Sequence, residues 1–386
     1  MIHLNTAGQG RMPDAVRTVL TECVRLEDRF GPHVLEERVG DLVHGEVHQR
    51  LEGLLNTPDG HTELFTGGAA AFDALVSGLT LGRGDRIWTT PYESAARLTT
   101  LRSVRDRTRC RIEVVPLRPD GDLDLGWMAA HIDDSVALVS VVHVPASRGI
   151  INPVEDIGRL LAPHRCLYAV DAAYSLGQLP VDVSRIGCHL LTGDGWRFLR
   201  GPRAVGFAYV APRLREELSR SDFGGGAPRA AAFTTRVPEP VPATAAVAAF
   251  TSALAHRAEL PAQPYEELIP ALHCAVVDVP GMELLAPGRY HSAVLAFHHP
   301  DLSSALLRRG LAERGVAVWK TVAEQTPLLD RPGGRATALR ASVYEGTTRQ
   351  DIDAFAEALA KTVADVSSRR VFPAPDGLAR IALVGS

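Results

Sequence analysis

Lysine is almost absent from this chain of 386 residues. Only two of its 41 basic residues are lysines, Lys320 and Lys361, and the others are arginines. A lysine amine can attack a carbonyl group and form an imine, whereas an arginine guanidinium stays protonated and is a poor nucleophile. Any reaction that requires an imine-forming lysine therefore has two candidate residues in this sequence.

Paired cysteines and long apolar runs are also missing. The five cysteines are scattered without a C-x-x-C pair, which excludes the usual signature of a zinc site or a disulfide framework and is typical of a reducing compartment. No stretch approaches the roughly 20 apolar residues that cross a bilayer, and residues 1–11 lack the pattern of a secretory signal. These absences predict a cytoplasmic protein without a metal site.

The composition is otherwise that of an ordinary globular protein. Hydrophobic residues make up 46% of the sequence and charged residues 22%, and the net charge is −4. A near-neutral balance without basic runs argues against nucleic acid as a partner. The length predicts two domains with ample apolar material for a core.

Short apolar runs alternate with helical patterns over the first 210 residues. The runs are nearly uncharged and rich in Val and Ile, as strands covered on both faces should be. Helical patterns such as Ala70–Leu79 and Val154–Leu161 separate them. The alternation predicts an α/β fold with a mostly parallel sheet between layers of helices. The predicted strands are Arg86–Thr90, Arg111–Leu117, Val136–His143, Cys166–Asp171 and Arg203–Val210.

The C-terminal part predicts a smaller α+β domain that follows a hinge. Residues 221–242 are rich in Gly, Pro, Ala and Arg, a composition typical of loops. We expect an N-terminal segment at 1–20, a large domain at 21–242 and a small domain at 243–386. The elements predicted for the small domain are helices at Ala243–Leu260, Leu302–Arg314 and Gln350–Val366 and strands at His291–Phe297, Val316–Trp319 and Leu339–Val343.

Three segments carry sequence motifs in a characteristic order and spacing. His143–Val154 reads HVPASRGIINPV, Val170–Val183 reads VDAAYSLGQLPVDV, and Leu191–Val210 reads LTGDGWRFLRGPRAVGFAYV. Two shorter matches are Leu4–Gly8 near the start and the R-x-S at Arg340–Ser342. Together these segments resemble the class V aminotransferases, a branch of the fold-type I enzymes that use pyridoxal phosphate (PLP), and the resemblance covers essentially the whole chain.

The resemblance implies both a fold and an assembly. A fold-type I enzyme has a large domain with a seven-stranded, mostly parallel sheet, a smaller α+β domain, and a homodimer with its active sites at the shared interface. The isopenicillin N epimerase-like and ergothioneine C–S lyase-like members are the most similar by eye. They imply, by analogy, a role in specialised amino-acid or sulfur metabolism.

Several residues correspond to ligand-binding positions of that family. Asp171 matches the aspartate that keeps the pyridine nitrogen of PLP protonated, and Arg340 matches the arginine that binds the substrate carboxylate. Ala7 lies in the matched opening segment and Tyr92 could stack on the ring, so both are candidate substrate contacts. His143 matches a motif residue and is a candidate acid or base, with a purely structural histidine as the alternative.

Other positions depart from the family pattern. Gly68, Ala69 and Ala70 belong to a glycine-rich helix start whose amides could hold the PLP phosphate, or which serves packing alone. Asp194 stands where a phosphate-binding Ser or Thr is usual, and a carboxylate there would repel the phosphate. Tyr174 replaces the glutamine that reaches the phenolic oxygen of PLP.

The same alignment places Arg197 on the lysine that forms the imine. Gly195–Leu199 reads GWRFL against the family pattern G-x-K-F-L, and no lysine precedes Lys320. Lys320 is expected at the surface, with a position in the cleft as the alternative. We therefore expect that any PLP bound here forms no Schiff base with the chain.

The sequence leaves three interpretations of function open. The first is a repurposed, degenerate enzyme that acts on an amino-acid-derived or carboxylate-bearing small molecule, with Arg197, His143 and Tyr174 as catalytic groups. The second is a non-catalytic subunit that pairs with a lysine-bearing homologue. The third is an aminotransferase, lyase or epimerase-like activity with PLP bound non-covalently. The absent lysine favours the first.

Overall fold

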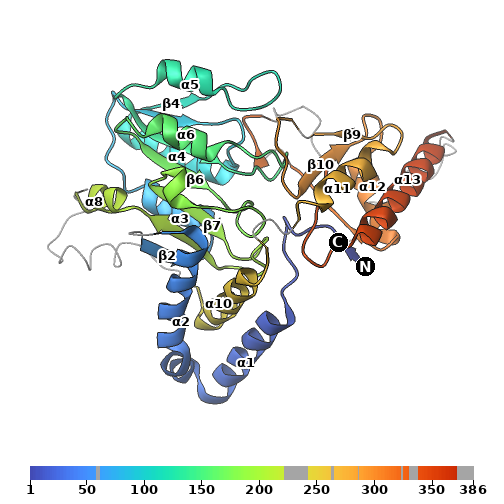
Figure 1. The fold of residues 1–386 in the computed structure, drawn as a ribbon, viewed down its shortest axis with the longest axis horizontal. Coiled ribbons are helices and arrows are strands. Elements are labelled where there is room, and N and C mark those ends of the chain that lie inside the picture. The colour runs from blue at the N-terminus through green and yellow to red at the C-terminus, as the bar shows by residue number, and fades with distance from the viewer. Residues whose placement is uncertain are drawn as a thin grey trace, which may run out of the picture.

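The computed structural model has two lobes of unequal size (Figure 1). Strands β2 to β8 form the sheet of the larger lobe, and strands β9, β10, β12 and β13 form a sheet in the smaller lobe. The predicted hinge at 221–242, except its last residue, and most of the tail from 367 lie outside the described residues. The structure describes residues 1–57, 61–220, 242–261, 265–285, 287–322, 325–329 and 338–371.

The larger lobe is built on a seven-stranded sheet with the order β2-β8-β7-β6-β5-β3-β4. Strand β8 pairs antiparallel with both of its neighbours, and the other pairs are parallel. The predicted mostly parallel sheet and its five predicted strands are therefore confirmed, with somewhat shorter strands. The bounds are β2 His61–Phe65, β3 Arg86–Thr89, β4 Arg111–Val114, β5 Val136–Val142, β6 Leu167–Asp171, β7 Leu190–Asp194 and β8 Gly206–Val210.

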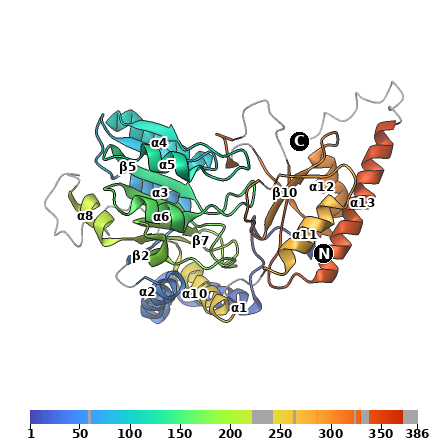
Figure 2. The same ribbon diagram turned by 45° about the horizontal axis from the view of Figure 1, so that its top comes forward.

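Helices cover both faces of this sheet (Figures 1 and 2). Successive residues of a strand point to opposite faces, so Ala169 of β6 packs in one core cluster and Val170 in another. The cluster of Ala169 includes residues of α3, α4 and α8, and that of Val170 includes residues of α5, α6 and α7. The bounds are α3 Gly68–Val76, α4 Ala95–Thr108, α5 Leu125–His131, α6 Val154–Leu161, α7 Val183–Ile186 and α8 Pro212–Arg220.

Three further helices form a layer below the larger lobe in both views. Helices α1 (Asp14–Phe30), α2 (Pro32–Leu55) and α10 (Thr244–Ala258) pack on one another. Phe250 and Leu254 of α10 lie in the same core cluster as strands of the seven-stranded sheet. The predicted boundary between 242 and 243 therefore precedes a helix that packs with the larger lobe, because the apolar face of α10 is buried there.

The smaller lobe holds a four-stranded sheet with the order β12-β13-β10-β9, in which every pair is antiparallel. The predicted strand Val316–Trp319 is divided between β11, which pairs in parallel with β1, and β12, which pairs with β13. No helix in the described ranges is long and apolar enough to cross a membrane. The bounds are β1 Ile2–His3, β9 Glu283–Leu284, β10 Val294–His298, β11 Val316–Ala317, β12 Trp319–Lys320, β13 Leu339–Ser342, α11 Leu268–Val277, α12 Ser304–Glu313 and α13 Arg349–Val371.

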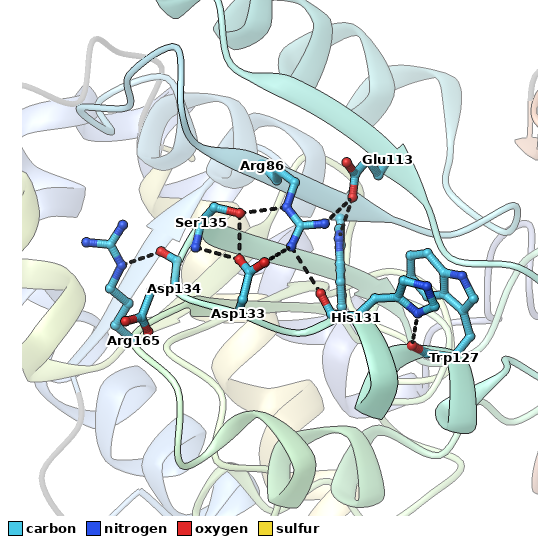
Figure 3. A network of polar contacts seen from close by, with 9 residues as sticks. Arg86, Glu113, Trp127, His131, Asp133, Asp134, Ser135 and Arg165 are labelled. Atoms are coloured by element: carbon cyan, nitrogen blue, oxygen red, sulfur yellow. Dashed lines mark hydrogen bonds and ion pairs between the residues drawn. The ribbon is translucent and has the colours of Figure 1, made fainter.

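A polar network closes the edge of the large sheet where the parallel strands begin (Figure 3). Arg86, the first residue of β3, forms ion pairs with Glu113 of β4 at 2.8 Å and with Asp133 at 2.9 Å. Its Nε also donates to the Ser135 hydroxyl at 2.7 Å. These contacts join β3 to β4 and to the segment that precedes β5.

Candidate active site

The carboxyl ends of β6 and β7 bring two sequence-predicted aspartates to one edge of the sheet. Asp171 ends β6 and pairs in register with Thr192 of β7, and Asp194 ends β7. In open α/β sheets ligands bind outside the carboxyl ends of the parallel strands. The sheet therefore presents these carboxylates where a ligand of this fold is expected.

Asp194 is bound by the start of helix α3 and by an arginine. Its Oδ1 accepts a hydrogen bond from the Gly68 backbone N–H at 2.9 Å, and its Oδ2 lies 2.8 Å from Arg197 Nε. The residue is only 6% exposed. Burial raises the pKa of Asp194, while the Arg197 charge and the Gly68 amide act against that shift. The position predicted to face a phosphate thus holds a carboxylate that is already paired.

Arg197 is fixed on three sides. Besides Asp194, its Nη1 donates to the Ala7 carbonyl at 2.7 Å, and its Cζ lies 4.0 Å from the centre of the Tyr174 ring. Burial lowers the pKa of Arg197, but nearby Tyr174, Asp194 and Asp171 outweigh burial and raise it overall. The guanidinium therefore stays charged and contributes an electrostatic contact at this position.

Arg340 reaches the site from the smaller lobe. It lies on β13, opposite Ala296 of β10, and is only 2% exposed. Its Nη1 donates to the Ala146 carbonyl at 3.3 Å, and its Cζ lies 5.8 Å from the Tyr174 ring centre. Among the described residues its Nε has no hydrogen-bond partner. Burial lowers the pKa of Arg340, as expected for a cation that lacks an anion.

The sequence motifs did not indicate a buried ion pair that lies next to the site. Arg97 Nε of α4 lies 3.1 Å from Glu93 Oε1, and the side chains are 1% and 0% exposed. Arg97 also donates to the hydroxyls of Thr192 at 3.0 Å and Ser140 at 2.9 Å. Burial raises the pKa of Glu93, and Asp171 raises it further. The one sequence signal was a Glu and an Arg four residues apart at a helix start.

His143 directly follows β5, and its side chain is buried. It follows β5 with the same alternation as Val139 and Val141, which pack on the α5–α6 side of the sheet, whereas the Asp171 partner Thr192 contacts α4. His143 lines a cavity of about 860 Å³ together with residues of α5 and α6. Burial lowers its pKa to about 4. The His143 backbone N–H donates to the Asp171 carbonyl at 2.9 Å, so the two backbones are adjacent, but no side-chain hydrogen bond joins the two residues in the part of the chain that the structure describes.

The remaining predicted contacts are distributed unevenly. Tyr92 is packed in the core and its hydroxyl donates to the Gly121 carbonyl at 2.6 Å, so it does not contact Arg197 or Arg340. Ala7 contacts Arg197 through its backbone carbonyl. Ala69 and Ala70 are exposed in the first turn of α3, and only Gly68 contacts Asp194.

Neither lysine lies at the site. Lys320 is exposed on β12, and Lys361 is exposed on α13, where its Nζ pairs with Glu357. The prediction of a surface position for Lys320 is therefore confirmed. The groups that meet at the site are guanidiniums, carboxylates and the Tyr174 phenol, which can bind a zwitterion and transfer protons.

The fold is an α/β fold with a large and a small lobe, and residues of both lobes meet at this site. The chain belongs to the aminotransferase class-V family, whose model matches residues 18–355. It is similar to the cysteine desulfurase of Haloferax volcanii, with 25% identity over 93% of this chain and 88% of the relative. Family membership indicates an enzyme.

Solved structures of related fold agree with this assignment. The cysteine desulfurase CsdA of Escherichia coli aligns with a TM-score of 0.81 and 19% identity over 95% of both chains. A mutant of the protein C-DES, solved with glycine linked covalently to its PLP cofactor, aligns with a TM-score of 0.79 and 19% identity over 93% of this chain and 96% of that one. At these identities the likeness confirms the predicted fold.

The comparisons correct two expectations. The narrower resemblance to epimerase-like and ergothioneine lyase-like members is wrong, because the relatives are cysteine desulfurases. The prediction of a degenerate enzyme, with its alternatives of a non-catalytic subunit and of transaminase-like chemistry, is also overturned. Relatives that span nine-tenths of the chain carry the name of a catalytic sulfur-transfer enzyme.

PLP is the cofactor of the family. The residues present in this site suit one of its groups and not the others. Asp171 is placed to hold a protonated ring nitrogen. The Gly68 amide that a phosphate would use is taken by Asp194, and the described site has no lysine for the aldehyde. The donor set therefore fits the ring nitrogen and does not fit the phosphate or the aldehyde.

Proposed function

We propose that the chain is an enzyme that binds cysteine, or a similar α-amino acid with a sulfur-bearing side chain, between its two lobes. It acts on the side chain of that substrate. Two observations support this proposal. Its relatives over most of its length are named cysteine desulfurases, and Arg340 offers a buried guanidinium whose Nε has no hydrogen-bond partner among the described residues. The second observation carries the proposal, because it is a property of this chain's own site.

Arg340 is the proposed anchor for the substrate carboxylate. A guanidinium binds a carboxylate through two parallel hydrogen bonds, which fix the orientation as well as the position of the ligand. A buried cation without an anion is unfavourable. A substrate carboxylate would remove that cost, so the resting site is organised to receive one.

Asp171 is proposed to contact the substrate ammonium group in place of the pyridine nitrogen that the family resemblance assigns to it. One of its oxygens accepts from the Ala173 backbone N–H at 2.9 Å, and no cation of the described residues forms an ion pair with it. The two other carboxylates near it, in Glu93 and Asp194, are each paired with an arginine. Asp171 and Arg340 thus remain for the opposite charges of an amino acid.

Tyr174 is the proposed proton-transferring group. The Cζ atoms of Arg197 and Arg340 lie 4.0 and 5.8 Å from the centre of its ring. Both cations would stabilise negative charge that develops on the phenol oxygen or on a substrate atom beside it. Replacing Arg197 by a neutral residue would remove one of these two cations.

We expect no covalent bond between PLP and the chain. Arg197 is proposed to stand at the imine-forming position that the sequence alignment gives, and its guanidinium cannot form an imine. Because the residues match only the ring nitrogen of PLP, the proposed roles above are confined to binding, orientation and proton transfer by the chain's own groups.

The test of this function is binding and turnover of L-cysteine by an Arg340 variant. Arg340→Lys keeps the charge but loses the paired hydrogen bonds, so we expect the dissociation constant for L-cysteine in calorimetry to rise about tenfold or more. Release of sulfur from L-cysteine should fall in parallel. Arg309→Lys, at an exposed arginine of α12 in the same lobe, is the matched control and should behave like the unaltered chain.

Two results would contradict the proposed function. One is unchanged affinity for L-cysteine in Arg340→Lys, since the carboxylate would then bind elsewhere. The other is an unaltered chain that neither binds L-cysteine nor releases sulfur from it. Circular dichroism of each variant confirms that the fold is retained.

A further inference from the structure

We propose that the Asp194–Arg197 ion pair makes the site selective, excluding phosphorylated ligands by filling the anion position at the start of α3 with a carboxylate of the chain. This inference deepens the function proposed above, because it concerns which ligands the same site admits. Its test uses inorganic phosphate and no amino acid, so its outcome is independent of the Arg340 experiment.

The start of α3 has the character of an anion site. The first amides of a helix lack partners within the helix and carry the positive end of its dipole. Here the residue that precedes α3, Gly67, supplies no side-chain cap. The Gly68 N–H instead donates to Asp194 Oδ1 at 2.9 Å. A carboxylate from the end of β7 therefore occupies the place that a phosphate oxygen would take.

The backbone packs closely around the start of α3. A Cβ built on Gly206 would lie 2.4 Å from Gly67 Cα, so β8 touches the backbone of the loop. A Cβ on Gly68 would lie 3.3 Å from the Gly193 carbonyl oxygen and 3.4 Å from Asp194 Oδ1. A phosphate that binds the Gly68 N–H would therefore have to displace the Asp194 side chain, which already accepts that hydrogen bond.

Charge opposes that displacement. Asp194 is buried and its Oδ2 is held by Arg197 Nε at 2.8 Å. A phosphate dianion at the Gly68 amide would either lie beside this carboxylate, with strong repulsion in a poorly solvated site, or take Arg197 from it and leave a buried carboxylate unpaired. Both routes cost free energy. The Asp194–Arg197 pair therefore keeps a phosphate from binding at the Gly68 N–H.

The consequence is a site with one vacant anion contact. Arg197 is neutralised by Asp194, whereas Arg340 keeps an unpartnered Nε among the described residues. A ligand with one carboxylate and no phosphate matches that arrangement. The ion pair would thereby act as a specificity determinant of the proposed enzyme, favouring free amino acids over phosphate esters.

Asp194→Thr tests the inference by removing the carboxylate. The variant leaves the Gly68 amide and the Arg197 charge free and adds a hydroxyl donor. We expect inorganic phosphate, titrated into the full chain in a calorimeter, to bind the variant about tenfold or more tighter than the unaltered chain. The same order is expected for PLP, whereas pyridoxal, which lacks the phosphate, should show no gain.

A conservative variant and a control complete the design. Asp194→Asn keeps the shape of the side chain and removes its charge, so phosphate should bind it more tightly than the unaltered chain but less tightly than Asp194→Thr. Asp301→Thr, at an exposed aspartate of the smaller lobe, should change nothing. Thermal melting identifies any variant that is not folded.

The inference is overturned if the unaltered chain binds phosphate as tightly as the folded Asp194 variants. Should Asp194→Thr fail to fold, Asp194→Asn decides alone: tighter phosphate binding supports the proposal, and unchanged binding rejects it.

Discussion

Burial sorts the charged side chains of the site into paired and unpaired groups. Asp194 and Arg197 satisfy each other, and their ion pair is joined by the Gly68 amide. Arg340 is as deeply buried but has no carboxylate among the described residues. Since isolated buried charges are strongly unfavourable, the unpaired guanidinium is the residue whose environment a ligand changes most.

The burial of His143 leads us to expect that the stability of the protein depends on pH. Burial lowers its pKa to about 4, so the folded chain binds its proton less tightly than the unfolded chain, where the pKa is about 6.5. The stability that this neutral histidine contributes is complete above pH 6.5 and is lost as the pH falls toward 4. We expect a loss of about 2 kcal/mol in the free energy of unfolding between pH 7.5 and pH 5.

His143→Gln measures that contribution in urea titrations at the two pH values. The variant should lose less stability between pH 7.5 and pH 5 than the unaltered chain, by about 2 kcal/mol. His33→Gln, at a histidine whose side chain is 94% exposed, should leave the pH dependence unchanged. Equal pH dependence in His143→Gln and the unaltered chain would show that His143 is protonated without cost.

Single residues were predictable where a motif carries them. The R-x-S at Arg340 and the strand-end aspartate Asp171 could be found in the sequence because each stands at a fixed place in a recurring segment. The position of His143 could not, because a residue just past a strand end faces either side of the sheet depending on where the strand stops. The partners of Arg97 could not be predicted either, because they lie on β5 and β7, far from it in the sequence.

At the scale of elements, the Glu93–Arg97 pair joins α4 to two strands of the sheet. Arg97 binds Ser140 of β5 and Thr192 of β7, and its Cζ lies 3.7 Å from the Phe72 ring centre of α3. Arg97→Met leaves the Glu93 carboxylate buried without its cation. We expect the free energy of unfolding, measured by urea titration, to fall by about 3–5 kcal/mol.

Arg102→Met is the matched control for this prediction. Arg102 lies on the same helix and is exposed, so its substitution should cost less than about 0.5 kcal/mol. A loss in Arg97→Met no larger than that of the control would mean that Glu93 takes up a proton at little cost and that the pair does not hold α4 in place.

The periodicity of the sequence predicts where helices and strands lie better than it predicts which elements pair with one another. The helix at Val154–Leu161 has the predicted bounds, since its apolar stripe and flanking proline are local signals. The run Val316–Trp319 was predicted as one strand but is divided between two sheets. Which neighbour a short strand finds is decided by the assembled fold, so the sequence could not specify it. For the same reason the sequence could not predict that α10 packs with the larger lobe.

At the scale of the whole molecule, the two-lobe α/β architecture was predictable because alternation of strands and helices allows few topologies. The N-terminal strand β1 was not, since it pairs with β11 more than 300 residues away in the sequence. The homodimer implied by the family resemblance stays a prediction. Both lysines of the chain lie exposed on the smaller lobe, and neither contacts Asp171, Arg197 or Arg340.

The most direct test is therefore borohydride reduction of the purified full chain in the presence of PLP, followed by intact-mass and peptide mass spectrometry. A reduced imine would fix PLP permanently to a lysine. We predict that the mass remains that of the bare chain, because the proposed imine-forming position holds Arg197, whose guanidinium cannot form an imine. A stoichiometric pyridoxyl adduct on Lys320 or Lys361, accompanied by visible absorption before reduction, would contradict the account.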